Sequence, residues 1–278
     1  MREQYEQFDV IVIGGGASGM MAAGIAASCG KKVLILDKNK RLGQKLAITG
    51  GGRCNITNDE SDLRLFLKHY GKAEQFLYSS FDQFNKDKTF SFFESLTMPM
   101  VVQARKRAFP QTERGEDVRT LMENFVRTHE VTVKTNTPVS RIDTVDGKIS
   151  GVIAGGKKYI SSNYILATGG VSHPETGSTG DGFGWMKELG HTVAAPTPSI
   201  VPLAVSDAWI KSLAGVSLSF MKITFYVNGV KQFNKKGKVL FTHFGLSGPL
   251  ILNSATKVSD LLHDGEVTAQ IDAYPDTD

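Results

Sequence analysis

A strand, a glycine-rich turn and a helix open this 278-residue chain, and they constrain its fold more than any other feature. The apolar run Phe8–Ile13 predicts a buried parallel strand, and the small residues of Ala17–Ser28 predict a helix packed close to a sheet. The run Val33–Leu36 predicts a second strand, which ends at Asp37. Together these segments predict a right-handed βαβ unit of a doubly wound α/β fold.

The turn inside this unit has the spacing of a dinucleotide-binding motif. Gly14, Gly16 and Gly19 fit GxGxxG, in which the first glycine allows a tight turn and the third lets the helix pack on the strand. The second glycine lets a pyrophosphate approach the backbone, and the amides of Ala17 and Ser18 stand at the positive end of the helix dipole. The turn therefore predicts a dinucleotide site.

An acid follows at the distance that a nucleotide ribose requires. Asp37 lies eighteen residues after Gly19, where a carboxylate accepts a hydrogen bond from a ribose hydroxyl. Lys38, Lys40 and Arg41 come next and in principle serve the 2′-phosphate of NADP, but the acid before them would repel that phosphate. Solvated surface charge is the favoured interpretation of the three, and Lys38 is kept as a candidate cofactor contact.

A second glycine cluster lies in the run Gly43–Asn58, which begins six residues after Asp37. A fold that binds only a nicotinamide dinucleotide needs no glycines there, whereas a flavoprotein of the two-dinucleotide-binding type needs backbone donors for its longer cofactor. Consecutive glycines expose N–H groups in a concave turn that suits anionic oxygens or the edge of a flavin ring. The loop favours FAD, and its candidate contacts are Lys45, Thr49, Gly50, Gly51, Gly52, Arg53, Cys54 and Asn55.

The two cysteines, Cys29 and Cys54, suggest no disulfide framework and fit a reducing, cytoplasmic environment. Cys54 lies in the glycine loop, where a redox role is one alternative. It has no CxxC or CxxxxC partner, so a buried structural thiol is favoured.

Charge and hydropathy narrow the possible partners. The net charge of +4 is too mild to predict nucleic-acid binding, and the densest basic cluster, Arg105–Arg107, is open to two interpretations, a solvated edge or an anion contact. Val10–Gly30 is uncharged and long enough to span a bilayer, but its three consecutive glycines fit a strand, turn and helix better. His173 and His191 lack partners at metal-ligand spacing, so we expect neither a membrane segment nor a metal site.

Periodicity predicts the elements that follow. Asp59–Pro99 has mainly helical spacing, Glu116–His129 has the pattern of an amphipathic helix, and Val131–Thr135 reads as a third parallel strand. Residues 139–168 hold β-rich runs separated by two Xaa-Gly pairs, which predicts a small antiparallel meander. Gly180–Leu189 predicts a short helix.

The pattern changes after a proline-rich stretch near residue 200. Longer β-runs appear there, such as Lys222–Val227 followed by a turn at Asn228–Gly229. This shift predicts a boundary between domains at residues 1–194 and 195–278.

Several motifs resemble one family, the YhiN-like flavoproteins, also called BaiN/RdsA-type or aminoacetone-oxidase-like NAD(P)/FAD-dependent oxidoreductases. TGGGRCNITN at residues 49–58 is close to a signature of that family, and FTHFGLSGP at 241–249 is similar to its FTHxGxSGP segment. Arg107–Pro110 resembles its GRxFP element, although Ala108 and the missing glycine depart from it. The family's ATG strand, which passes near the cofactor, is resembled by Ala167, Thr168, Gly169 and Gly170.

The resemblance implies an FAD-binding domain of the two-dinucleotide-binding type with an antiparallel meander, plus part of an inserted β-rich substrate or cap domain. It implies hydride transfer to or from flavin on a small organic substrate, either amine oxidation or reduction of an unsaturated compound, with NAD(P)H as a possible electron donor. Members of the family are over a hundred residues longer and return to the flavin with a GGYN-type segment. None occurs here, so we expect a C-terminally truncated chain.

The roles of two further residues have two interpretations each, and two other functions compete with the flavin oxidoreductase. Asp181 is expected either to contact flavin ribityl or phosphate oxygens or to cap the helix after it. His243 is a candidate proton donor, with ordering of its own loop as the alternative. An NAD(P)-dependent dehydrogenase without flavin and a non-catalytic nucleotide-binding fragment remain the competing functions.

Overall fold

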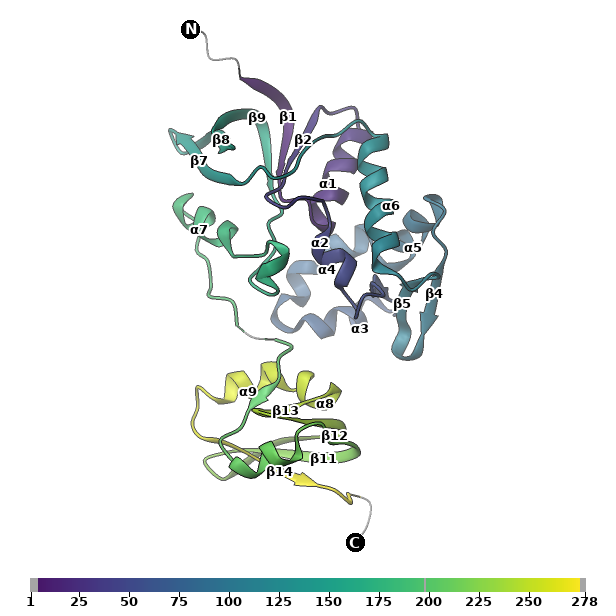
Figure 1. Cartoon of the computed structure of the whole chain (residues 1–278), viewed down its shortest axis with the longest axis vertical. Coiled ribbons are helices and arrows are strands. Elements are labelled where there is room, and N and C mark those ends of the chain that lie inside the picture. The colour runs from purple at the N-terminus through teal and green to yellow at the C-terminus, as the bar shows by residue number, and fades with distance from the viewer. Residues whose placement is uncertain (1–4, 198, 276–278) are drawn as a thin grey trace. The chain divides into compact units, whose positions relative to one another are not determined.

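The computed structural model describes residues 5–197 and 199–275 and divides into two units, Met1–Val193 and Ala194–Asp278. Each unit has its own main sheet (Figure 1). Each also has its own hydrophobic core. The boundary expected after residue 194 lies one residue from this division.

The first unit is built on a six-stranded sheet. In spatial order its strands are β6 (Thr132–Lys134), β2 (Val33–Leu36), β1 (Glu6–Ile13), β9 (Lys157–Leu166), β8 (Lys148–Ala154) and β7 (Val139–Val145). The first four are mutually parallel, and β9, β8 and β7 are antiparallel hairpin neighbours. The predicted α/β class, the third parallel strand and the meander are confirmed. One feature differs from expectation, because β9 is both the last strand of the meander and a parallel neighbour of β1.

Both faces of this sheet are covered at β1 and β2, which explains the continuous apolar runs Val10–Ile13 and Val33–Leu36. Helices α1 (Ala17–Ser28) and α6 (Gly115–Thr128) lie side by side over one face (Figure 1). Alternate strand residues enter two separate clusters: Val10, Val12, Val33 and Ile35 pack with α1 and α6, whereas Ile11, Ile13, Leu34 and Leu36 form the other cluster. Trp185 of α7 (Asp181–Glu188) packs against this second cluster.

The segment between β2 and α6 is mainly helical, as predicted. It holds α2 (Gln44–Ile48), α3 (Leu63–Leu67), the 3-10 helix η1 (Lys68–Ala73), α4 (Glu74–Gln83) and α5 (Lys86–Ser95). Asp62 and Asn85 cap α3 and α5 through their side chains. Sequence reasoning missed a small antiparallel sheet in the order β3 (Thr57–Asn58), β5 (Arg107–Pro110), β4 (Met100–Gln103), whose strands are too short to show periodicity.

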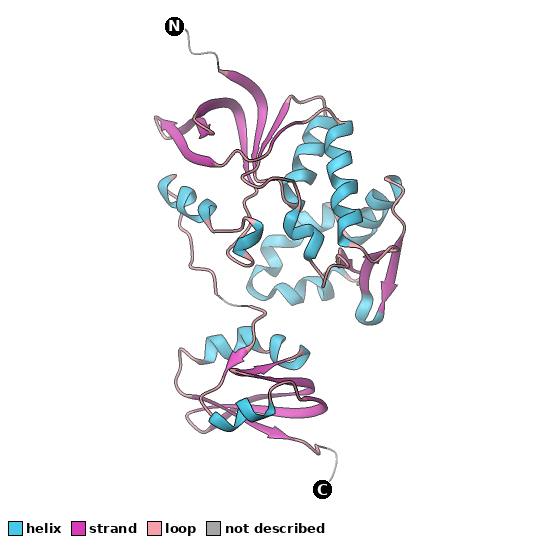
Figure 2. Cartoon of the chain, in the orientation of Figure 1, coloured by secondary structure: helices cyan, strands magenta, loops and turns pink. Residues whose placement is uncertain are grey.

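The second unit is a five-stranded antiparallel sheet with helices (Figure 2). Its strands in order are β10 (Leu203–Ala204), β13 (Gly245–Ser247), β12 (Val230–Thr242), β11 (Ser217–Val227) and β14 (Val267–Asp272). The helical segments are η4 (Ala208–Leu213), α8 (Pro249–Leu252) and α9 (Ala255–Leu261). The predicted turn at Asn228–Gly229 is confirmed, with both residues in the left-handed conformation that a tight hairpin requires.

Over residues 5–197 and 199–275, no helix combines the length and the apolar character needed to cross a bilayer. The stretch Val10–Gly30 instead forms the second half of β1, the glycine turn and α1.

Gly24 sets the close approach of α1 to α6, because a methyl group at this position would overlap the ring of Phe125. That ring packs edge-on against Phe92 and His129, with centroid distances of 5.1 and 4.8 Å, so it has little room to move. We therefore expect Gly24→Ala to lower the free energy of unfolding by about 1–3 kcal/mol. Urea denaturation measures this loss.

Gly184→Ala is the matched control, since it adds the same methyl group to α7 with no atom within 4 Å. It should leave stability unchanged or raise it by up to about 1 kcal/mol, because alanine loses less backbone entropy than glycine in a helix. Similar losses in both variants would contradict the packing account.

Candidate functional site

A cavity of about 690 Å³ lies at the carboxyl ends of the parallel strands β1, β2 and β9. Its wall includes Ile13 and Leu36, the last residues of β1 and β2, and Ala167, which follows β9. Doubly wound sheets bind their ligands at this end of the strands, and the volume is within the range of cofactor pockets, roughly 300–1,000 Å³. The cavity is the candidate site.

The three motif glycines have different structural roles. Gly14 has a left-handed φ of 102°, and a methyl group there would come 2.5 Å from the carbonyl oxygen of Ala167. A methyl group on Gly19 would overlap the carbonyl oxygen of Gly14. Gly16 lines the cavity and has nothing within 4 Å of the position its methyl group would take. Packing requires glycine at positions 14 and 19, whereas the free space at Gly16 belongs to the cavity.

The N-terminus of α1 presents backbone donors to the same space. The first intrahelical bond runs from Met20 N to Gly16 O, and among the described residues no side chain caps the helix. The amides that precede Met20 therefore lack intrahelical partners. Since Ala17 and Ser18 line the cavity, this end of the helix can bind an anionic group.

Asp37 ties the glycine turn to the end of β2. Its carboxylate is 6% exposed and accepts hydrogen bonds from Gly15 N at 2.6 Å and Asn39 N at 2.7 Å. Burial raises its pKa above the usual value, and the two backbone N–H groups oppose that rise. The carboxylate lines the cavity and keeps lone pairs for a ligand hydroxyl.

The second glycine loop is folded around Thr49. Its carbonyl oxygen accepts from Gly52 N at 3.1 Å and Cys54 N at 2.9 Å, while Gly50, Gly51 and Gly52 have left-handed φ values of 61°, 69° and 82°. The carbonyl of Gly52 in turn accepts from Gly115 N at 2.7 Å, which fixes the loop to the start of α6. The left-handed backbone conformation of this loop therefore explains why glycine occupies these three positions.

The structure separates the predicted contacts in this loop into two groups. Thr49, Cys54 and Asn55 line the cavity, whereas Gly50, Gly51, Gly52 and Arg53 lie outside its wall. The guanidinium of Arg53 pairs with Glu113 at 3.1 Å and lies 4.5 Å from the Phe109 ring centroid. Its charge is thus used between the loop and β5.

Two lysines close the polar side of the cavity. Lys45 Nζ donates to Ser172 O at 2.5 Å and to Ser178 Oγ at 2.6 Å. Lys38 Nζ pairs with Asp181 at 2.7 Å, and this contact lowers the pKa of the aspartate. Both lysines line the cavity, as do Asp181 and the segment 167–170. The helix-capping alternative for Asp181 is wrong, because Gly180 is the N-cap of α7 and no side-chain cap bond is formed there within the described chain.

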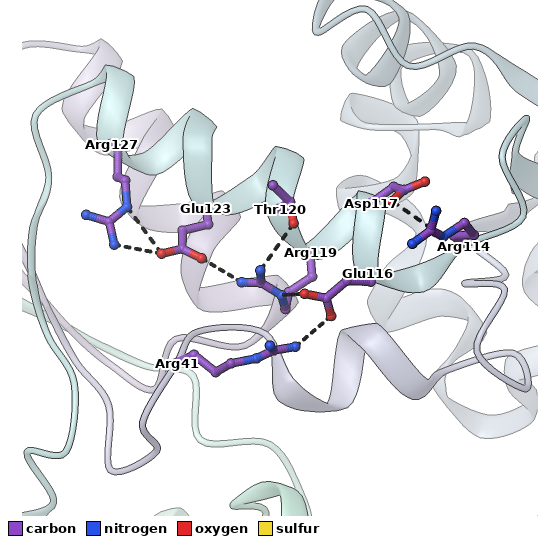
Figure 3. Close-up of polar contacts among 8 residues, drawn as sticks. All are labelled: Arg41, Arg114, Glu116, Asp117, Arg119, Thr120, Glu123 and Arg127. Carbon is purple, nitrogen blue, oxygen red and sulfur yellow. Dashed lines mark hydrogen bonds and ion pairs between the residues drawn. The ribbon is translucent and has the colours of Figure 1, made fainter.

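A ladder of ion pairs on α6 and Arg41 lies beside the start of α2 (Figure 3). Residues 43–46, which are the N-cap and first turn of α2, line the cavity. Arg119 of α6 is only 8% exposed and donates to Glu116 at 2.8 Å and Glu123 at 2.5 Å. Glu116 also accepts from Arg41 at 2.6 Å, and Arg119 lowers its pKa. The stem of Arg119 lies against Gly43, where a methyl group would come within 2.8 Å of its Cγ. Burial of this arginine therefore depends on glycine at position 43.

Sequence reasoning missed the apolar wall of the cavity. It includes Met21, Leu46, Ile56, Phe93, Val118, Met122, Val139 and Trp185. Val118 and Met122 have i, i+4 spacing, which correctly predicted a buried helix face but did not distinguish core from cavity wall.

His243 lies outside this cavity wall, in the second unit. It is exposed at the turn between β12 and β13, where its ring packs edge-on against Phe244 with a centroid distance of 5.0 Å. Thr242 orders the turn, because its Oγ1 donates to Gly245 O and accepts from Gly245 N. A catalytic role for His243 stays a prediction.

Among the described residues, no group of three or more His, Cys, Asp or Glu side chains lies close enough together to hold a metal ion.

The fold and this cavity define a Rossmann-type dinucleotide-binding domain. The chain belongs to the family described as HI0933-like protein Rossmann domain, which matches residues 8–251. This match confirms the resemblance stated from the motifs.

Characterised relatives lie in the same family. The chain is 28% identical over 268 residues to a 3-dehydro-bile acid delta(4,6)-reductase of Clostridium scindens, covering 95% of this chain and 64% of that protein. It is 29% identical over 253 residues to a ribosomal RNA dihydrouridine synthase of Haemophilus influenzae, covering 87% and 59%. The chain thus spans about three fifths of the length of these relatives.

A solved structure supports the fold alone. Sdh1 of Mycobacterium smegmatis, in complex with UQ1, aligns with a TM-score of 0.53 at 19% identity, covering 67% of this chain and 39% of Sdh1.

The environment of Cys54 predicts low reactivity. The side chain is 1% exposed, and burial raises the pKa of its thiol to about 11. Since the thiolate is the reactive form, we expect iodoacetamide at pH 8 to alkylate exposed Cys29 and to leave Cys54 unmodified in the folded protein. Peptide mass spectrometry with and without urea measures both sites.

Urea supplies the control, because unfolding should make the two cysteines equally reactive. The raised pKa also implies that the thiol's contribution to stability is present below about pH 9 and is lost as the pH rises through about 11. Rapid alkylation of Cys54 in the folded state would show a thiolate and contradict the structural role.

Proposed function

We propose that the first unit is the FAD-binding part of a flavin-dependent oxidoreductase. The observation that carries the proposal is a single cavity lined by the GxGxxG turn, by Asp37, by the loop with the second glycine cluster and by the segment after β9. Membership in a family with a reductase and a dihydrouridine synthase supports the same class of chemistry.

The residues present fit the cofactor in three places. The free space at Gly16 and the amides of Ala17 and Ser18 would hold the pyrophosphate. Asp37 would accept from the adenosine ribose. The polar edge at Thr49 and Asn55 and the apolar wall would hold the flavin end.

Bound FAD would supply the hydride chemistry, and the chain would supply binding and electrostatics. Lys45 and the N-terminus of α1 place positive charge beside the cavity, which stabilises anionic groups there. Phe93 and Met122 exclude water from the apolar wall. Cys54 is held as a neutral thiol, so its role is packing.

The proposed substrate is an unsaturated organic ring or chain that accepts hydride. The proposed electron donor is NAD(P)H, and the second unit is the proposed substrate-binding part. The names of the two relatives favour reduction over amine oxidation. One relative acts on a bile acid and the other on ribosomal RNA, so an RNA base is a second candidate substrate beside a free small molecule. We place this reaction in the cytoplasm.

The test is a visible spectrum of the purified chain after reconstitution with FAD and gel filtration. Retained flavin absorbance that bleaches with dithionite supports the proposal. A colourless chain that binds NADPH tightly would favour a dehydrogenase without flavin, and a chain that binds neither would overturn both. A second sample extended to the full length of the relatives separates a weak partial site from a wrong assignment.

Gly16→Ala should separate binding from folding. The added methyl group meets no protein atom, so stability should change by less than about 0.5 kcal/mol. It would occupy the space proposed for the pyrophosphate, so FAD affinity should fall about tenfold or more. Fluorescence titration with FAD and urea denaturation measure the two quantities.

Gly19→Ala is the contrasting variant, because its methyl group would overlap Gly14 O. It should reduce both stability and FAD affinity. If Gly16→Ala binds FAD as tightly as the parent, the proposal that the pyrophosphate binds at this turn is wrong.

A further inference from the structure

The outer face of the sheet in the second unit carries an unusual arrangement of lysines. The pairing register places Lys222 of β11 opposite Lys236 of β12, and Lys231 of β12 opposite Tyr226 of β11. Lys238 lies two residues beyond Lys236 and so on the same face. Four lysines therefore share one surface of a single hairpin.

This surface is separate from the core of the unit. The alternate residues Ile223, Phe225, Val239 and Phe241 point to the opposite face, where they pack with α8. Lys231, Lys236 and Lys238 are exposed. The side chains between the lysines are mostly polar: Thr224 pairs with Asn234 and Gln270 in the register, and Tyr226 Oη donates to Gln270 at 3.1 Å.

The charge distribution does not follow from composition. Residues 194–278 contain seven lysines and seven acidic residues, so the unit is neutral overall. In the register of β11, β12 and β14, the acidic residue on the outer face is Asp272, opposite Lys222. The register places Lys222 between Lys236 of β12 and Asp272 of β14, so positive charge is concentrated along β11 and β12.

An exposed aromatic residue stands at one end of the lysines. The register shifts between Leu218 and Met221, so that Ser219 and Phe220 oppose the single residue Lys238. Phe220 is 81% exposed and has a left-handed φ of 62°, a strained conformation for a bulky residue. A bulge redirects side chains, and here it presents an aromatic ring beside the positive face.

We propose that this lysine face, formed by Phe220, Lys222, Lys231, Lys236 and Lys238, binds single-stranded RNA. Lysines neutralise backbone phosphates, amide and hydroxyl side chains offer hydrogen bonds, and an exposed ring stacks on an unpaired base. The inference rests on the proposed function in its form with an RNA substrate. The inference adds to that function a surface that would bind the RNA strand carrying the substrate base.

The test uses the whole chain and a fluorescein-labelled single-stranded 20-nucleotide oligouridylate, with anisotropy read over a series of salt concentrations. The triple variant Lys222→Gln, Lys236→Gln, Lys238→Gln should bind at least about tenfold more weakly at low salt. The slope of log affinity against log salt should become shallower by about 2, because each lost phosphate contact on a single strand accounts for about 0.7.

The matched control neutralises three exposed lysines of the first unit: Lys31→Gln, Lys72→Gln, Lys148→Gln. It changes net charge equally, so it should retain the parent slope. An equal loss in both variants would mean diffuse attraction and overturn the proposal, as would parent protein that binds vesicles of anionic lipid but no RNA.

Phe220 gives an independent test, because removing its ring leaves the charge unchanged. Phe220→Ala should weaken RNA binding several-fold with the salt slope unaltered, since stacking does not release counterions. Phe76→Ala removes an equally exposed ring of the first unit, 85% accessible, and should have no effect. Equal behaviour of these two variants would exclude Phe220 from the surface.

The flavin spectrum of each sample distinguishes the two proposals. If the samples retain flavin but the lysine variants bind RNA as tightly as the parent, the proposed RNA surface is wrong and the proposed oxidoreductase function stands. If the lysine substitutions weaken RNA binding but no sample retains flavin, the RNA surface is supported and the proposed function is wrong for this chain.

Discussion

The buried carboxylate of Asp37 is the interaction on which the first unit depends. It accepts the N–H of Gly15 in the first glycine turn and the N–H of Asn39 beyond β2, so one side chain sets the distance between two loops. A carboxylate desolvated in this way needs its hydrogen bonds, and the loops in turn need the carboxylate to satisfy their amides. The cavity between them owes its shape to this mutual requirement.

The sequence predicted those features of the fold whose determining interactions lie within a short stretch of the chain. The βαβ unit was predictable because hydrophobic runs, small residues and glycines with separate steric roles all indicated the same structure in a stretch of thirty residues. The three hairpin turns were predictable because their Xaa-Gly pairs adopt left-handed backbone angles that few other residues tolerate. In each case the determining interactions are local.

Long-range choices were not predictable from the same patterns. Nothing local to Lys157–Leu166 indicates that this strand joins β1 as well as β8. Arg53 offered a plausible charge for a cofactor, but nothing in its own loop predicts its ion pair with Glu113, which lies sixty residues later. The apolar wall of the cavity has the composition of core, and only the tertiary arrangement leaves space beside Phe93 and Met122.

The double pairing of β9 has a consequence for how this family can vary. Its antiparallel register with β8 is fixed by the two-residue turn at Gly155–Gly156, while its parallel register with β1 determines where Ala167–Gly170 meets the glycine turn. A single insertion at Gly155–Gly156 would slide the strand and change which side chains face each layer. The turn at Asp146–Gly147 joins β7 and β8 at the sheet edge and carries no such constraint. Natural length variation in the meander should therefore accumulate at that outer turn, and the inner turn should keep its length across relatives.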